Sequence, residues 1–129
     1  MNELRHGALF LKVTERADPA LLSVLWEGKS ADRDPAAVLK PFFDSLLTRT
    51  KLAHAALDMH FEKLEHFNSS TIAVLIQLIN AATEQRIALT FFYDPSARWQ
   101  ALSFDAIQRA LKPFGGASPV TVNFVAVKP

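Results

Sequence analysis

Ala55–Ala82 has the sequence AALDMHFEKLEHFNSSTIAVLIQLINAA, and this stretch decides the fold. Ala55–Met59, with which the stretch begins, is a short apolar run, and it predicts a buried strand. A polar connection follows. Asn68–Thr71 then supplies a cluster of residues that favour helix N-caps, directly before the apolar run Ile72–Ile79. The order predicts a strand, a connection and a helix that continues to about Glu84.

The start of this predicted helix, at Ser69 or Ser70, is a candidate site. The N–H groups in the first turn of a helix point outward without partners, and the helix macrodipole favours negative charge there. A hydroxyl-rich start on an apolar helix is therefore suited to an anion. An ordinary N-cap is the alternative interpretation, because Ser and Asn are the usual cap residues.

The same residues resemble the STAS domain family, which includes bacterial anti-sigma factor antagonists of the SpoIIAA type. Leu57-Asp58 is similar to the family's apolar strand that ends in Leu-Asp. After a loop, Phe67–Leu75 is similar to the pattern apolar-Asp-Ser-Ser-Gly-apolar-Gly-x-Leu that opens a helix. The chain departs from this pattern with Asn68 for the aspartate, Thr71 for the first glycine and Ala73 for the second.

This resemblance implies a function as well as a fold. In such proteins the second serine of the pattern is phosphorylated by a partner kinase, and that position here is Ser70. The partner in the family is a histidine-kinase-like serine kinase that sequesters a sigma factor, and a phosphatase can reverse the modification. Any ATP would then belong to the partner, which agrees with the absence of GxxxxGKS and GxGxxG motifs from the chain.

The rest of the chain predicts an α/β fold. Apolar or alternating runs predict further strands, and Asp18-Pro19 is a turn signal between the first two, which should pair antiparallel. The predicted strand that contains Ala55–Met59 extends back to Lys51. The full set of predicted strands is Gly7–Val13, Ala20–Trp26, Lys51–Met59, Arg86–Tyr93 and Val120–Val127. The glycine that closes the second strand, Gly28, has a counterpart in the resembling family.

Two more helices are expected. After the turn-rich Ser30–Pro35, Asp34 can cap a helix whose apolar face repeats at three- and four-residue spacing, although Pro41 should kink or restart it. Asp94-Pro95 should cap a last helix over Ser96–Leu102 that restarts as Phe104–Leu111 and breaks at Pro113 and Gly115-Gly116. Its inward side chains would be Trp99, Leu102, Ile107 and Leu111.

The element order β β α β α β α β predicts one domain over residues 1–129. This domain should be a STAS-like mixed β-sheet with the helices packed mainly on one face. In the central helix, Ile72, Leu75, Ile76, Ile79 and Thr83 should face the sheet. Val74, Leu78 and Ala81 point the other way, so they are either covered by flanking helices or form a partner surface.

The residues also offer two enzymatic alternatives. A metal site could draw on His54, Asp58, His60, Glu62 and His66, but HExxH and cysteine pairs are absent. A serine hydrolase could use Ser70, His66 and Asp58, yet a GxSxG elbow is absent too. Neither pattern predicts a metal, a cofactor or a catalytic residue.

Composition limits the class of partner. The 129 residues carry 14 basic and 13 acidic side chains without a basic stripe, so nucleic acid is not an expected partner. The chain has no cysteine, which suits a reducing cytoplasm, and no apolar run long enough to cross a membrane. We therefore expect a cytoplasmic protein, and its oligomeric state stays open.

The leading hypothesis is a regulatory protein-binding module that is not an enzyme. Phosphorylation of Ser70, or of Ser69 as second choice, would control its binding to a serine kinase that acts as an anti-sigma factor. An unphosphorylated STAS-like scaffold is the first alternative, and a small hydrolase using Ser70 is the second. The residues expected to bind the partner are Asp58, Asn68, Ser69, Ser70, Thr71, Val74 and Leu78.

Overall fold

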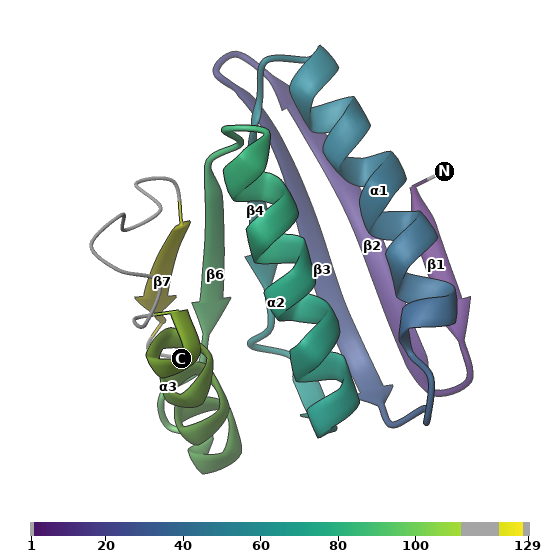
Figure 1. The fold of residues 1–129 in the computed structure, drawn as a ribbon, viewed down its shortest axis with the longest axis vertical. Coiled ribbons are helices and arrows are strands. Elements are labelled where there is room, and N and C mark those ends of the chain that lie inside the picture. Colours follow the sequence, from purple (N-terminus) through teal and green to yellow (C-terminus); the bar gives the residue numbers. More distant parts are fainter. Residues whose placement is uncertain (1, 112–121, 128–129) are drawn as a thin grey trace.

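The computed structural model describes residues 2–111 and 122–127 (Figure 1). In this part of the chain, seven strands form one mixed sheet and three helices pack on it. The helices are α1 (Ala36–Leu52), α2 (Ser69–Glu84) and α3 (Arg98–Leu111). The strands are β1 (Glu3–His6), β2 (Leu9–Ala17), β3 (Ala20–Ser30), β4 (Ala56–His60), β5 (Leu64–Phe67), β6 (Leu89–Tyr93) and β7 (Val122–Ala126).

The sheet has the order β1-β2-β3-β4-β6-β7, and β5 pairs with the far end of β3. The strands β1, β2 and β3 pair antiparallel, as the short Asp18-Pro19 link predicted. All later pairings are parallel, so the segments that contain α1, α2 and α3 cross over the sheet, whereas β5 follows β4 in the same direction without a crossover. Figure 1 shows the three helices on the same face, which confirms the predicted α/β class and the one-sided helix layer.

This topology gathers the helix starts at one edge of the sheet. Each helix runs back against the parallel strand that precedes it, so α1, α2 and α3 all begin at the carboxyl ends of the strands (Figure 1). In open α/β sheets this edge is where loops and helix N-termini converge into binding sites. We call it the carboxyl edge.

A continuous apolar core lies between the sheet and the helices. Leu22, Val24 and Trp26 alternate along the inner face of β3, and all three are fully buried. The rings of Trp26 and Phe61 pack in a tilted arrangement with centroids 4.8 Å apart. Phe61 is the centre of an aromatic cluster that also contains Phe91 and Phe104. The opposite face of the sheet, lined by Ser23, Leu25, Asp58, His60 and Phe92, carries no helix in the described residues, and we call it the open face.

Several predicted strand boundaries were wrong. The predicted first strand, Gly7–Val13, began too early, because Gly7 lies in a turn with φ near 59° and β2 starts only at Leu9. The strand before this turn, β1, was not predicted. The predicted polar connection contains β5, since a bulge at Gly28 and Lys29 lets the end of β3 pair a second time. Gly28 does not close β3. It sits at φ 83° where a Cβ would lie 1.8 Å from the carbonyl oxygen of Ala8.

The third predicted strand began too early. Lys51 belongs to α1, and His54 occupies the turn that follows at φ 53°, so β4 starts only at Ala56. The helical periodicity of α1 continues to Leu52, so the first residues of the predicted strand are helical. The fourth strand is also shorter than predicted, because Arg86 lies in a turn at φ 58°.

The helix expectations need three corrections. The side chain of Asp34 does not cap α1, and Pro35 takes the cap position without a side-chain hydrogen bond. Pro41 lies inside an unbroken helix on its exposed side, where water can serve the carbonyl group that lacks a donor. Helix α3 is one segment, and Leu102 is 61% exposed instead of inward. The predicted breaks at Pro113 and Gly115-Gly116, and Val120, lie outside the described residues.

Candidate functional site

The start of α2 is capped by Asn68, not by a serine. Asn68 has the extended backbone typical of an N-cap, and its Oδ1 accepts hydrogen bonds from the Thr71 N–H at 2.9 Å and the Thr71 hydroxyl at 2.8 Å. Ser69, Ser70 and Thr71 are therefore the first three helical residues. The sequence placed this helix start correctly.

The capping residue Asn68 is hydrogen-bonded to the end of β3 and to the segment between β3 and α1. The Asn68 Nδ2 donates to the carbonyl oxygen of Asp32 at 2.7 Å, and the Asn68 N–H donates to the carbonyl oxygen of Ser30 at 3.0 Å. The hydroxyl groups of Ser30 and Thr71 lie 2.7 Å apart, and both side chains are buried. Buried polar groups with all their partners present fix the helix start relative to the sheet.

Ser69 and Ser70 are the exposed residues of this helix start. None of the hydrogen bonds of the described residues uses the backbone N–H of Ser69 or of Ser70, because the cap satisfies only that of Thr71. The first turn of α2 also carries no acidic side chain. Two hydroxyl groups and two available N–H donors thus face solvent at the positive end of a rigidly held helix.

A buried glutamine holds the neighbouring part of the carboxyl edge. Gln100 of α3 is 1% exposed, and its Nε2 donates to the carbonyl oxygens of Phe61 at 2.7 Å and Leu64 at 3.2 Å. Its Oε1 accepts from the N–H of Asp94 at 2.8 Å. This single side chain ties the loops after β4 and β6 together. The sequence reasoning missed it, although a glutamine inside an apolar helical pattern was an available signal.

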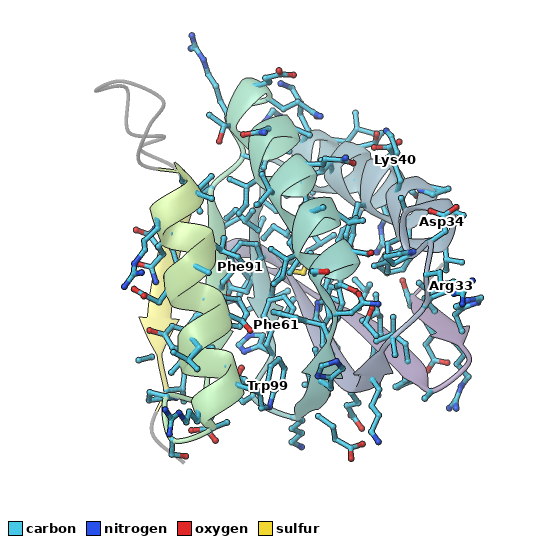
Figure 2. The ribbon with its side chains drawn as sticks, turned by 60° about the horizontal axis from the view of Figure 1, so that its bottom comes forward. Arg33, Asp34, Lys40, Phe61, Phe91 and Trp99 are labelled. Atoms are coloured by element: carbon cyan, nitrogen blue, oxygen red, sulfur yellow. The ribbon has the colours of Figure 1, made fainter. Side chains whose placement is uncertain are left out.

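Figure 2 looks toward this edge and separates its two sides. Trp99 lies at the start of α3 and packs on Phe67, with ring centroids 5.1 Å apart, while Phe61 and Phe91 lie deeper. Arg33 and Asp34 stand on the other side, in the exposed segment before α1. The start of α2 lies between an aromatic side and a charged side.

Two acidic groups at the carboxyl edge are stabilised in their charged form. The Asp32 carboxylate accepts a hydrogen bond from His6 at 2.6 Å, which lowers the pKa of Asp32, and the N–H of Asp34 adds to the effect. The hydroxyl and N–H groups of Ser96 lower the pKa of Asp94 in the same way. Neither carboxylate was among the predicted site residues.

Asp58 does not belong to this edge. Its neighbours Leu57 and Met59 point into the core, so Asp58 points to the open face, on the opposite side of the sheet from α2. Partial burial there raises the pKa of Asp58, against the attraction of His60 and Arg16. The strand alternation thus separates Asp58 from the serines with which it was grouped.

Val74 and Leu78 are buried, at 4% and 3% exposure. They lie with Phe43 and Leu47 of α1 at the contact between the two helices. Of the two predicted alternatives for this side of α2, coverage by a flanking helix is confirmed, and an exposed partner surface at these residues was wrong. The buried stripe is rotated toward α1, which leaves Ile72 and Ile76 only half-buried.

The candidate groups for other chemistry do not assemble. No group of three metal-binding side chains is found in residues 2–111 and 122–127. His60 Nδ1 lies 3.4 Å from Glu62 Oε1, and His60 stacks on Phe92, so this histidine is engaged on the open face. Ser70 and Asp58 lie on opposite sides of the sheet. Asp58 therefore cannot orient a histidine toward Ser70, as a serine hydrolase triad would require.

Comparisons with known proteins leave the family open. No family model, no curated protein and no solved structure matches the chain. Among the described residues, no helix combines the length and the apolar character needed to span a membrane.

Proposed function

We propose that this chain is a cytoplasmic regulatory module of the STAS type, whose binding to a protein partner is switched by phosphorylation of Ser70 at the start of α2. Ser69 is the second choice. The observation that carries the proposal is the exposure of both hydroxyl groups at a helix start that Asn68 and Thr71 hold in place. The resemblance of Phe67–Leu75 to the family pattern supplies the class of partner, a serine kinase that acts as an anti-sigma factor.

The physical basis of the switch is charge. A phosphate adds about −1.5 to −2 charges at pH 7. The available N–H groups of Ser69 and Ser70 and the positive end of α2 favour that charge within the protein. A partner surface that fits a neutral hydroxyl would be repelled by it. Modification should therefore leave the fold intact and weaken the complex.

A second candidate function is supported by two of the three departures from the family pattern, Asn68 and Thr71. Asn68 donates to Asp32 and Thr71 contacts Ser30, so both departures have structural roles that an aspartate and a glycine could not fill. Asn68 and Thr71 would also be expected in a chain in which this helix start has only a structural role and is not a phosphorylation site. An unphosphorylated scaffold that binds a partner through the same edge is consequently the alternative.

Intact-mass measurement separates the two. The chain and its Ser69→Ala and Ser70→Ala variants are each incubated with ATP and every serine kinase encoded beside the gene. We expect a gain of one phosphate in the wild type and in Ser69→Ala, and none in Ser70→Ala. A gain that persists in Ser70→Ala and disappears in Ser69→Ala would move the site by one residue. The absence of any gain would favour the scaffold.

A further inference from the structure

A hollow lies at the edge of the sheet opposite the carboxyl edge, where β4 and β6 begin and where α1 and α2 end (Figure 1). Its volume of about 450 Å³ is within the range of small-molecule sites. The titratable residues that line it are Lys51, His54 and Arg86, and all its other lining residues are uncharged. We call it the amino-edge hollow, and its lining side chains can contribute only positive charge.

Both helices end at this hollow in a Schellman motif, in which one residue after the helix has a left-handed backbone. In α1 this residue is His54, at φ 53°, and its N–H donates to the carbonyl oxygen of Lys51 at 3.1 Å. In α2 it is Arg86, at φ 58°, and its N–H donates to the carbonyl oxygen of Thr83 at 3.1 Å. The second hydrogen bond of each motif is also present, from the N–H of Ala55 to Thr50 and from the N–H of Ile87 to Ala82. Glycine is the usual residue at the left-handed position, because a Cβ is strained there.

The basic side chains of the hollow are not neutralised by acidic neighbours. Neither His54 nor Arg86 has a side-chain hydrogen bond or ion pair to any residue that the structure describes, and both are exposed. The Lys51 Nζ donates to a backbone carbonyl oxygen at the end of α2 at 3.0 Å. That acceptor is neutral, so the lysine keeps its charge and has further protons to donate. Acidic residues of the same edge, such as Asp18 and Glu84, do not line the hollow.

The helix macrodipole does not explain this arrangement. Cations are favoured near the end of a helix, but any position in the last turn offers that benefit without a strained backbone. The last turn of α2 contains Glu84 and no basic residue. Arg86 is instead the first basic residue after it, at the one position where a side chain is strained. Strained residues that persist in a structure are characteristic of functional sites.

We propose that the amino-edge hollow binds a phosphate-bearing small molecule through Arg86, Lys51 and His54. The planar guanidinium of an arginine can donate to two phosphate oxygens at once, and a lysine ammonium adds a point charge. The strain at His54 and Arg86 is then retained because it directs both side chains to the same ligand. The hollow and Ser70 lie at opposite ends of α2, so this site is independent of the switch proposed above.

Inorganic pyrophosphate is the probe, titrated calorimetrically into the full chain at fixed ionic strength. Arg86→Gly should raise its dissociation constant at least about tenfold, because a charge-assisted phosphate contact is lost. Without pyrophosphate the same variant should melt no lower than the wild type, since glycine is unstrained at this position. His54→Gly should change both quantities in the same directions. Arg33→Gly removes an equal charge from the exposed segment before α1 and should bind like the wild type.

The result that supports the site is this pairing of unchanged or higher stability with weaker binding in Arg86→Gly. A wild type that does not bind pyrophosphate at millimolar concentration would overturn the proposal. Equal weakening by Arg86→Gly and Arg33→Gly would also overturn it, because it would show diffuse attraction to the whole chain. Weakening by Arg33→Gly alone would place the anion at the carboxyl edge, which would exclude the amino-edge hollow.

Discussion

The start of α2 and the flank of the same helix differ in what they can offer a partner. At the start, polar side chains bond one another and leave two serine hydroxyl groups exposed. Along the flank, apolar side chains pack under α1 and leave nothing accessible. The sequence pattern had assigned both regions to one partner surface. The difference shows that, of these two regions, only the start of α2 at the carboxyl edge remains a candidate partner surface.

The strongest test of this comparison is a truncation on the flank. Leu78→Ala should lower the free energy of unfolding by about 2–5 kcal/mol, because it leaves a cavity between α1 and α2. Leu102→Ala removes the same atoms from an exposed site and should change stability by less than about 0.5 kcal/mol. Denaturant melts measure both. Equal effects of the two substitutions would mean that the flank is not covered.

At the helix start, Thr71→Val should have the next largest effect. It keeps the shape of the side chain but removes the hydroxyl that contacts Ser30 and Asn68, at a cost of about 1–3 kcal/mol. Thr71→Ser keeps the hydroxyl and serves as control. In a double-mutant cycle, Ser30→Ala should cost less in the Thr71→Val background than alone. Strict additivity would contradict the buried hydroxyl pair.

A smaller effect is expected for Asn68→Asp, which introduces the aspartate that the STAS pattern has at the corresponding position. The carboxylate can still accept from Thr71, but it cannot donate to the carbonyl oxygen of Asp32. Loss of this one hydrogen bond should cost about 0.5–1.5 kcal/mol at neutral pH. A thermal melt of the variant measures it. A variant as stable as wild type would show that the link to the β3–α1 segment contributes nothing.

The smallest effects concern pH, and their signs differ between the carboxyl edge and the open face. The pKa of Asp32 is lowered, so Asp32 stabilises the fold above its ordinary value of 3.8 and loses this contribution as pH falls through the lower folded value. The pKa of Asp58 is raised, so its charged form opposes folding at neutral pH. Asp32→Asn should lower the melting temperature at pH 7 and Asp58→Asn should raise it. Both differences should shrink on acidification.

The α/β class, the helix start at Ser69 and its end at Glu84 followed from local signals in the sequence. Capping residues and hydrophobic periodicity act within one element, so they can be recognised without the fold. The role of Val74 and Leu78 could not be recognised in this way, because it depends on where α1 packs. Asp58 was wrongly grouped with the residues of the α2 start for a related reason. Which face of β4 the helices cover depends on how the whole sheet is assembled.

The supporting residues of the site were the least predictable. Ser30, Asp32 and Gln100 act through contacts with segments far along the chain, and only Gln100 carried a local signal, as a glutamine inside an apolar helical pattern. The strands β1 and β5 were not predicted for the same reason. They are short, and their formation depends on pairing with β2 and β3.

In the proposed switch, phosphorylation at the start of α2 controls partner binding without disturbing the fold. The most direct measurement is the affinity of the partner kinase for the unmodified chain, the chain phosphorylated on Ser70, and Ser70→Ala. We expect equal affinity for the unmodified chain and Ser70→Ala, and binding at least about tenfold weaker for the phosphorylated chain at an unchanged melting temperature. Equal affinity of all three forms, or unfolding of the phosphorylated chain, would contradict it.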